Sequence, residues 1–446
     1  MTEAAFDFLR AEIADCQVAR PLARVTEVGR GLLRIIGAGA DWGMGDRVLA
    51  GTAPAALGGE IVALDGQGAT VLTDEAPEGI RLGDPVERAV SACIAPHDSW
   101  LGRVIDPFGR PLDGRPLIRG TFARPLRAAP PPPAVRRRLG ARLETGLRVF
   151  NTLLPLVRGQ RIGLFAGSGV GKSTLLSQFA RHVAADVIVI ALIGERGREL
   201  REFVEDVLGP DGMARSVVVA ATSDQSALIR RRCAWAAMAV AERFRDQGKQ
   251  VLFLADSVTR LAEAHREVAL AAGEPPSLRG YPPSTAHLIM ALAERAGPGP
   301  EGAGDISAVF SVLVAGSDMD EPVADILRGV LDGHVVMDRD IAERGRYPAI
   351  NLLRSVSRSL PAAADEAENR LIGRARRLLG AYDRAEMMIQ AGLYVAGSDP
   401  LVDAAIRVWP QLDAFLSEAE PDGVGASFAR LAEILARSEE GPAYQT

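Results

Sequence analysis

Residues 161–174 read RIGLFAGSGVGKST, and this stretch decides the fold of the central part of the chain. An apolar run of strand type ends directly in a glycine-rich loop, and a helical pattern follows. A strand, such a loop and a helix in this order form a P-loop, although Ala166 stands where the strict pattern has its first glycine. We therefore predict that the loop binds phosphate through its backbone N–H groups, with a site made of Gly167, Ser168, Gly169, Val170, Gly171, Lys172, Ser173 and Thr174.

Two side chains of the loop have specific predicted roles. Lys172 brings a positive charge to the β- and γ-phosphates of a nucleotide, and the Ser173 hydroxyl is predicted to ligate Mg²⁺. A magnesium site also needs a carboxylate at the end of a neighbouring strand, and the run VLFLAD (251–256) supplies Asp256. The structural alternative is that Asp256 caps the helix that follows it. The pattern thus predicts ATP as substrate and Mg²⁺ as cofactor.

Hydrolysis needs further groups that act on water and on the transferred phosphoryl group. The run IGERGRE (193–199) places Glu195 directly after an apolar strand, at the sheet edge where α/β folds bind ligands. We predict that Glu195 activates water; the alternative is a surface ion pair with Arg196 or Arg198. An arginine at the transition state is worth roughly 10³ to 10⁵ in rate. Both Arg260 and Arg358 are candidates, and the pattern does not choose between them.

The chain has 446 residues, too many for a single domain. Short apolar runs between Gly- and Asp-rich turns predict a small β-barrel at 23–95. Strongly apolar runs then alternate with helical patterns, such as 172–182 and 226–246, which predicts an α/β core with a parallel sheet. Later residues show helical periodicity alone. The predicted units are an amphipathic partner-binding helix (1–22), the barrel (23–95), the central domain with the linker that leads into it (96–361) and a helical domain (362–446).

Several features indicate where the protein works. Its net charge of −6 argues against broad nucleic-acid binding. The N-terminus lacks the pattern of a signal peptide, and no apolar run approaches the ~18 residues of a membrane helix, so we expect a cytoplasmic protein. The amphipathic pattern over 4–18 suits packing on its own domain or binding of a partner equally well. Pro130–Pro133 predict an extended connector, and the arginines that follow at 136–138 predict a solvated charge run.

The chain resembles a known group, the rotary-type ATPase superfamily, which includes the catalytic subunits of F- and V-type ATPases. The segments that carry this resemblance are AGSGVGKST (166–174), GERGRE (194–199), LADSVTR (254–260) and PAINLLRSVS (348–357). Longer segments resemble most closely the flagellum-specific and type III secretion export ATPases. These are LIGERGRELREF (192–203), REVALAAGEPPSLRGYPPS (266–284) and DGHVVMDRDIAERGRYPAINLL (332–353).

The resemblance implies an α/β fold with a RecA-like P-loop core, a β-barrel before it and a helical domain after it. It further implies a ring of six subunits with the active site between neighbours. The matching positions imply a catalytic carboxylate at Glu195, a γ-phosphate contact at Arg196 and the Walker B carboxylate at Asp256. They also imply an aromatic that stacks on adenine, Tyr347, and an arginine finger given to the next subunit, Arg358.

The function implied is ATP hydrolysis that energises protein export through a flagellar apparatus. Because the chain carries both Glu195 and Arg358, a ring of identical copies would be complete at every interface. The implied partners are a regulator at the N-terminal helix, an export gate, a stalk and substrate–chaperone complexes, which would hold the ring at the periphery of the inner membrane.

Three other functions are alternatives to protein export by a flagellar ATPase. A virulence-associated export ATPase uses the same chemistry. A ring-shaped RNA translocase needs stacking aromatics in its N-terminal domain, whereas residues 23–95 contain one aromatic, Trp42, and we expect no specific nucleic acid. A non-hydrolysing subunit of a mixed ring would not need both an intact P-loop and Glu195.

Overall fold

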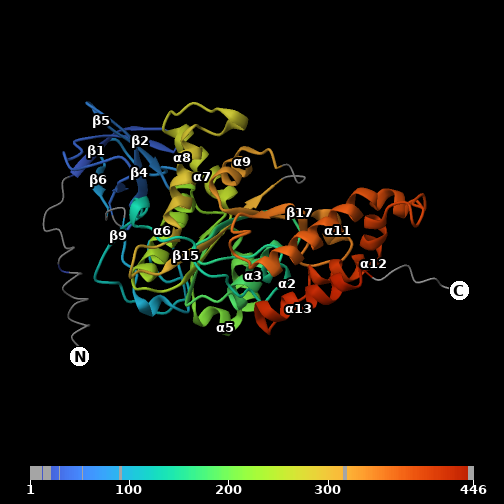
Figure 1. Cartoon of the computed structure of the whole chain (residues 1–446). Coiled ribbons are helices and arrows are strands. Elements are labelled where there is room, and N and C mark those ends of the chain that lie inside the picture. The colour runs from blue at the N-terminus through green and yellow to red at the C-terminus, as the bar shows by residue number, and fades with distance from the viewer. Residues whose placement is uncertain are drawn as a thin grey trace.

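The structure is a computed structural model that describes residue 13 and residues 22–29, 31–52, 54–89, 93–314 and 319–439. A barrel lies at one end of the molecule, a group of helices lies at the other, and a sheet covered by helices lies between them (Figure 1). Apart from Ile13, the predicted N-terminal helix lies outside the described residues. Within the described ranges, every helix is too short or too polar to cross a membrane.

Six strands of the described chain close into the predicted barrel, in the order β1-β2-β5-β4-β3-β6. Alternate side chains point inward, as the burial pattern of β5 shows, and Val25, Ile35 and Val71 form part of the barrel core. Trp42 also belongs to this core and is 6% exposed, so its ring does not form an open stacking surface. The strands are β1 (Leu22–Val28), β2 (Leu32–Ile36), β3 (Arg47–Ala50), β4 (Leu57–Asp65), β5 (Gly68–Thr73) and β6 (Pro85–Arg88).

The central sheet follows the order β17-β16-β10-β15-β13-β11-β12-β8, with β14 paired to β15. Neighbours along this order are parallel except β16 and β17, so β10, β11 and β13 all end at one edge. The strongly apolar runs predicted for the α/β core form β10 (Arg161–Ala166), β11 (Val187–Glu195), β12 (Ser216–Thr222), β13 (Val251–Asp256) and β15 (Asp305–Leu313). The sequence did not single out β8 (Arg103–Ile105), β14 (Gly297–Pro298), β16 (Gly333–Met337) or β17 (Ile350–Ser357). A separate ribbon joins β7 (Cys93–Ile94) to β9 (Arg124–Pro125).

Helices cover both faces of the sheet and form two hydrophobic cores. The two predicted helices are confirmed as α3 (Lys172–His182) and α6 (Ala227–Asp246), and Ser226 caps α6 by accepting a hydrogen bond from the N–H of Ile229. One core contains α3, and the other contains α6. The remaining α-helices of this region are α2 (Arg148–Asn151), α4 (Gly197–Glu202), α5 (Gly209–Ala214), α7 (Val258–Ala271), α8 (Ser284–Arg295), α9 (Pro322–Val330) and α10 (Arg339–Glu343). A π-helix spans Phe203–Leu208, and 3-10 helices span Asp98–Trp100, Pro133–Val135 and Leu278–Gly280.

The C-terminal region is helical, with α11 (Glu366–Gln390), α12 (Pro400–Phe415) and α13 (Gly423–Ala436). A capping box formed by Asp365 and Glu368 starts α11. Buried side chains of these helices belong to the same core as Phe179 of α3, so a single core joins α3 to the C-terminal helices. The fold class is therefore as predicted, whereas the domain boundaries stay a prediction.

The linker into the central domain differs in one respect from the sequence prediction. Arg136 donates to the carbonyl of Pro131 and pairs with Glu294, and Arg137 pairs with Asp305 at 2.5 Å. The prediction of a solvated charge run was wrong for Arg136, whose side chain is 15% exposed, whereas Arg137 is 40% exposed; each has a carboxylate partner more than 150 residues further along the chain. The two ion pairs fasten the linker to the central domain.

Candidate nucleotide-binding site

The P-loop joins the end of β10 to the start of α3. Gly169 and Gly171 have φ angles of 77° and 86°, a left-handed conformation that favours glycine. Within the described chain, α3 starts without a side-chain cap, since its N-cap residue is Gly171. The first N–H groups of α3 and the positive end of its dipole therefore face the loop, an arrangement that suits a phosphate group.

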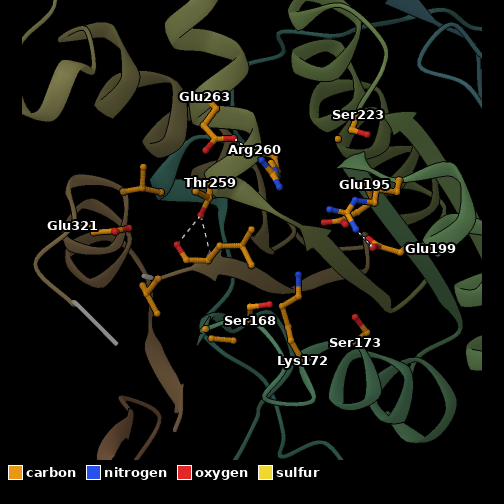
Figure 2. Close-up of a pocket in the computed structure, with 18 of the residues that line it drawn as sticks. Ser168, Lys172, Ser173, Glu195, Glu199, Ser223, Thr259, Arg260, Glu263 and Glu321 are labelled. Atoms are coloured by element: carbon orange, nitrogen blue, oxygen red, sulfur yellow. Dashed lines mark hydrogen bonds and ion pairs between the residues drawn. The ribbon is translucent and has the colours of Figure 1, made fainter. Parts of the chain in front are cut away.

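The loop forms one wall of a cavity of about 1050 Å³. Figure 2 shows Lys172, Glu195 and Arg260 around this cavity, and the three come from the start of α3, the end of β11 and α7. The sheet topology explains the arrangement, because parallel strands bring these loops to the same edge. The predicted residues in the lining are Gly167, Ser168, Gly169, Gly171, Lys172, Ser173, Thr174, Glu195 and Arg196; Val170 is buried beneath the loop.

Asp256 lies at the end of β13 and is 4% exposed. It accepts a hydrogen bond from the Ser311 hydroxyl at 2.7 Å and forms an ion pair with Lys172. The cap of the following helix, α7, is Ser257, which accepts from the N–H of Arg260. The alternative role of Asp256 as a helix cap is therefore wrong, and its carboxylate faces the P-loop lysine.

A smaller cavity of about 220 Å³ brings the predicted magnesium ligands together. Ser173, Glu195 and Asp256 all line it. A hydroxyl and a carboxylate suit Mg²⁺, which usually takes one or two carboxylates and completes its shell with water and substrate phosphate. Within the described residues, no cluster of three or more His, Cys, Asp or Glu could hold a metal ion alone. The donor set thus fits a metal that binds together with a nucleotide.

Glu195 has a strongly altered acidity. The pKa of Glu195 is raised to about 7, chiefly by burial and then by the negative charge of Asp256; Lys172 lowers it, and Glu199 adds to the rise. A carboxylate with a pKa near 7 suits general base catalysis. Arg196, the N-cap residue of α4, pairs with Glu199 at 3.5 Å. The ion pair that Arg196 makes in this structure is therefore with Glu199 and not with Glu195.

The two candidate finger arginines lie in different places. Arg260 lines the cavity and pairs with Glu263 at 3.1 Å. Arg358 follows β17 and donates to the carbonyls of Leu331 and Arg328, outside the described lining of the cavity of its own chain. Arg260 therefore lies at the nucleotide cavity of its own chain, whereas Arg358 lies outside the described lining of that cavity.

Tyr347 lies beside the P-loop and is half exposed. A Cβ atom placed on Gly171 would come within 3.1 Å of the Tyr347 ring, so the ring packs closely against the loop. The structure therefore places this aromatic next to the phosphate-binding residues, although it does not line the described part of the large cavity.

Sequence reasoning missed part of the cavity wall. Arg230 of α6 lines the cavity and pairs with Glu267 at 2.9 Å, and its side chain packs next to Gly194. The three successive arginines at 230–232 were a visible signal, but no local pattern shows which of them faces the cavity. The other residues missed are Ala166, Gly194, Glu199, Ser223, Thr259, Glu263, Arg279, Tyr281, Leu313, Val314, Glu321, Pro322 and Val323.

The site and the fold define a P-loop nucleoside triphosphatase, because they combine the P-loop, the paired Lys172 and Asp256 and the parallel sheet. The family model described as "ATP synthase alpha/beta family, nucleotide-binding domain" matches residues 146–357, and the model "T3SS EscN ATPase C-terminal domain" matches residues 364–433. A "Flagellum-specific ATP synthase" of Caulobacter vibrioides is 51% identical over 77% of this chain and 79% of its own length. A "Type 3 secretion system ATPase" of Pseudomonas syringae pv. syringae is 44% identical over 82% of this chain and 83% of its own.

Solved structures agree with these sequence relatives. The assembled ATPase EscN from the type III secretion system of enteropathogenic E. coli has a TM-score of 0.86 and 36% identity, and the match covers 93% of this chain and 100% of that chain. EscN in complex with its central stalk EscO gives a TM-score of 0.83 over the same shares. The chain belongs to the flagellar and type III secretion export ATPases of the ATP synthase alpha/beta family, and it is an ATPase.

Proposed function

We propose that this ATPase works with Mg²⁺ as a homohexameric ring and energises protein export through a flagellar type III apparatus. The observation that carries the proposal is one site that contains the P-loop, Glu195 and Asp256, in a chain 51% identical to a flagellum-specific relative. A virulence-associated secretion system is the second candidate. It is favoured by the similarity to EscN over 93% of the chain.

The chain's own residues supply most of the chemistry. The N–H groups of the loop and Lys172 bind the phosphates, which requires Lys172 to leave Asp256. Ser173 and Asp256 would then hold Mg²⁺, which when bound neutralises charge that develops on the phosphates. Glu195 in its deprotonated form accepts a proton from the attacking water, and Arg196, with a side chain 76% exposed, extends to the γ-phosphate.

The position of Arg358 supports a site shared between copies. Its guanidinium is held by two carbonyls outside its own cavity, on an exposed part of the surface beside β17. In a closed head-to-tail ring, each copy would present this arginine to the nucleotide of its neighbour and Tyr347 to its own adenine. Because every copy also has Glu195, each of the six interfaces would be able to hydrolyse ATP.

The loop between α11 and α12, together with the last turn of α11, is a suitable contact for a stalk. Met387, Leu393 and Val395 are 84%, 73% and 71% exposed, an unusual concentration of apolar surface at the far end of the helical region. EscN was solved with a central stalk, and we assign the equivalent contact here to this loop. A regulator at the N-terminal helix, an export gate and substrate–chaperone complexes would complete the assembly and keep the ring at the periphery of the inner membrane.

Mixing two inactive variants tests the shared site. Lys172→Ala removes the phosphate contact, and Arg358→Ala removes the finger, so each variant alone should lose roughly 10³-fold or more in hydrolysis rate. A mixture should regain activity, because hybrid interfaces combine an intact P-loop with an intact finger. Arg339→Ala is the matched control, since Arg339 is an exposed arginine paired only with Glu343 in the described structure.

The interpretation of the mixture depends on assembly. Specific activity of the unmodified protein should also rise with protein concentration, because dilution separates the copies. If the mixed variants co-assemble on a sizing column and remain inactive, the shared site is refuted and the finger acts within its own chain.

A further inference from the structure

A second cavity, of about 670 Å³, lies where the barrel meets the central domain and is separate from the nucleotide site. Figure 1 shows α6, α7 and α8 next to the barrel. The cavity wall comes from these three helices, from β4 and from the linker at 127–130. None of these lining residues takes part in the proposed hydrolysis.

Most of the wall is apolar. Val268 and Ala269 of α7 face the cavity together with Leu288 and Leu292 of α8. Alanines and a proline of the linker add to this surface. A cavity of this size with apolar walls and a few polar groups at one end is typical of a small-molecule site.

Two guanidinium groups and one carboxylate lie together at the polar end. Arg231 pairs with Glu60 at 2.6 Å, and Arg127 approaches the same carboxylate at 3.4 Å, so two guanidinium groups share one carboxylate. The side chain of Arg231 is 6% exposed, and its Nε–H is buried with no partner in the described structure. A buried donor without a partner is costly, and an anion at this end would satisfy it.

The other charged groups of the wall have partners of their own. Arg295 is neutralised by a bidentate pair with Glu242. Glu274 accepts hydrogen bonds from the N–H and the hydroxyl of Ser284. Burial lowers the pKa of His265 to about 4, so its ring is neutral near pH 7.

The same two guanidinium groups lie over one aromatic ring. Arg127 Cζ is 4.3 Å from the ring centroid of Trp235, and Arg231 Cζ is 5.2 Å from it. Arg127 belongs to the linker, and its side chain is 51% exposed. The Trp235 ring adds an aromatic surface beside the buried charge of Arg231.

We propose that this cavity binds a small amphipathic anion. Its apolar or aromatic body would lie against α7 and α8, and its carboxylate or sulfonate would pair with Arg127 and Arg231. Such a ligand would touch the barrel and the central domain at once. It would also lie next to Arg230, which precedes Arg231 on α6 and lines the nucleotide cavity.

The first experiment measures binding of anilinonaphthalenesulfonate, an aromatic sulfonate, to the full-length protein by its fluorescence. Saturable binding at one site per chain is expected. Octanoate should displace the probe at concentrations at least about tenfold lower than octanol or octylamine do, because only octanoate pairs with the arginines. Equal displacement by the three compounds would refute an anion site.

Three variants locate the site. Ala291→Trp fills the cavity mouth, whereas Met290→Trp adds the same ring at the neighbouring exposed position of α8, outside the cavity wall. Ala291→Trp and Arg127→Ala should each weaken probe binding at least about tenfold, whereas Met290→Trp leaves it unchanged. If Ala291→Trp binds the probe as Met290→Trp does, with both variants hydrolysing ATP normally, the probe binds elsewhere and the proposal is wrong.

Discussion

The raised pKa of Glu195 predicts how the rate of ATP hydrolysis depends on pH. Because burial and the charge of Asp256 raise the pKa of Glu195 to about 7, about a tenth of the side chains are deprotonated at pH 6 and about nine-tenths at pH 8. The deprotonated form is the base, so kcat/KM should rise about tenfold between these values. With an ordinary carboxyl pKa the same interval would change kcat/KM by only a few per cent.

Glu199→Gln tests the cause of this dependence. Glu199 raises the pKa of Glu195 through a hydrogen bond and through its charge, so the variant should reach full activity at a lower pH than the unmodified chain. Steady-state hydrolysis at excess Mg²⁺ measures both profiles in the same buffers, which makes the ionisation of ATP common to both. Glu205→Gln removes the same charge from an exposed ion pair and should leave the profile unchanged. A flat kcat/KM from pH 6 to 8, or identical profiles for Glu199→Gln and Glu205→Gln, would refute the reasoning.

Three further predictions concern the loop, the core and the metal. Gly171→Ala should weaken ATP binding at least about tenfold in equilibrium titration, because the residue has a positive φ and its Cβ would lie 3.1 Å from the Tyr347 ring. Glu242→Gln should lower the free energy of unfolding by about 3–5 kcal/mol in urea titration, because Arg295 would remain buried without its carboxylate, whereas Glu343→Gln at an exposed pair should change it by less than about 0.5 kcal/mol. Chelation with EDTA should abolish hydrolysis and added Mg²⁺ should restore it, while unchanged hydrolysis in EDTA would contradict the assigned metal site.

The sequence predicted those helices and strands whose own residues show a clear hydrophobic pattern. The helix over 172–182 and the strand that ends at Ala166 follow from periodicity and from a glycine loop between them. The strand ends that carry Glu195 and Asp256 were predictable because parallel strands deliver their carboxyl ends to one edge. The short strand β8 was not, since its three residues form a strand only by pairing with β12.

The sequence also could not predict which carboxylate each arginine pairs with. Arg137 looks like one member of a charged run, yet its carboxylate partner is Asp305, brought near by the fold. Arg230 and Arg231 are neighbours in the chain, but one pairs with Glu267 at the nucleotide cavity and the other with Glu60 of the barrel. Which way each side chain points depends on tertiary packing and not on residue type.

The core shared by α3 and the C-terminal helices has a mechanical consequence. Phe179 of α3 packs edge-on against Phe150, and the same core contains Val408 of α12 and Leu431 of α13. Close-packed interiors have low compressibility and transmit strain. We therefore expect a force on the tip of the helical region to be transmitted to the start of α3, where Lys172 is proposed to bind phosphate.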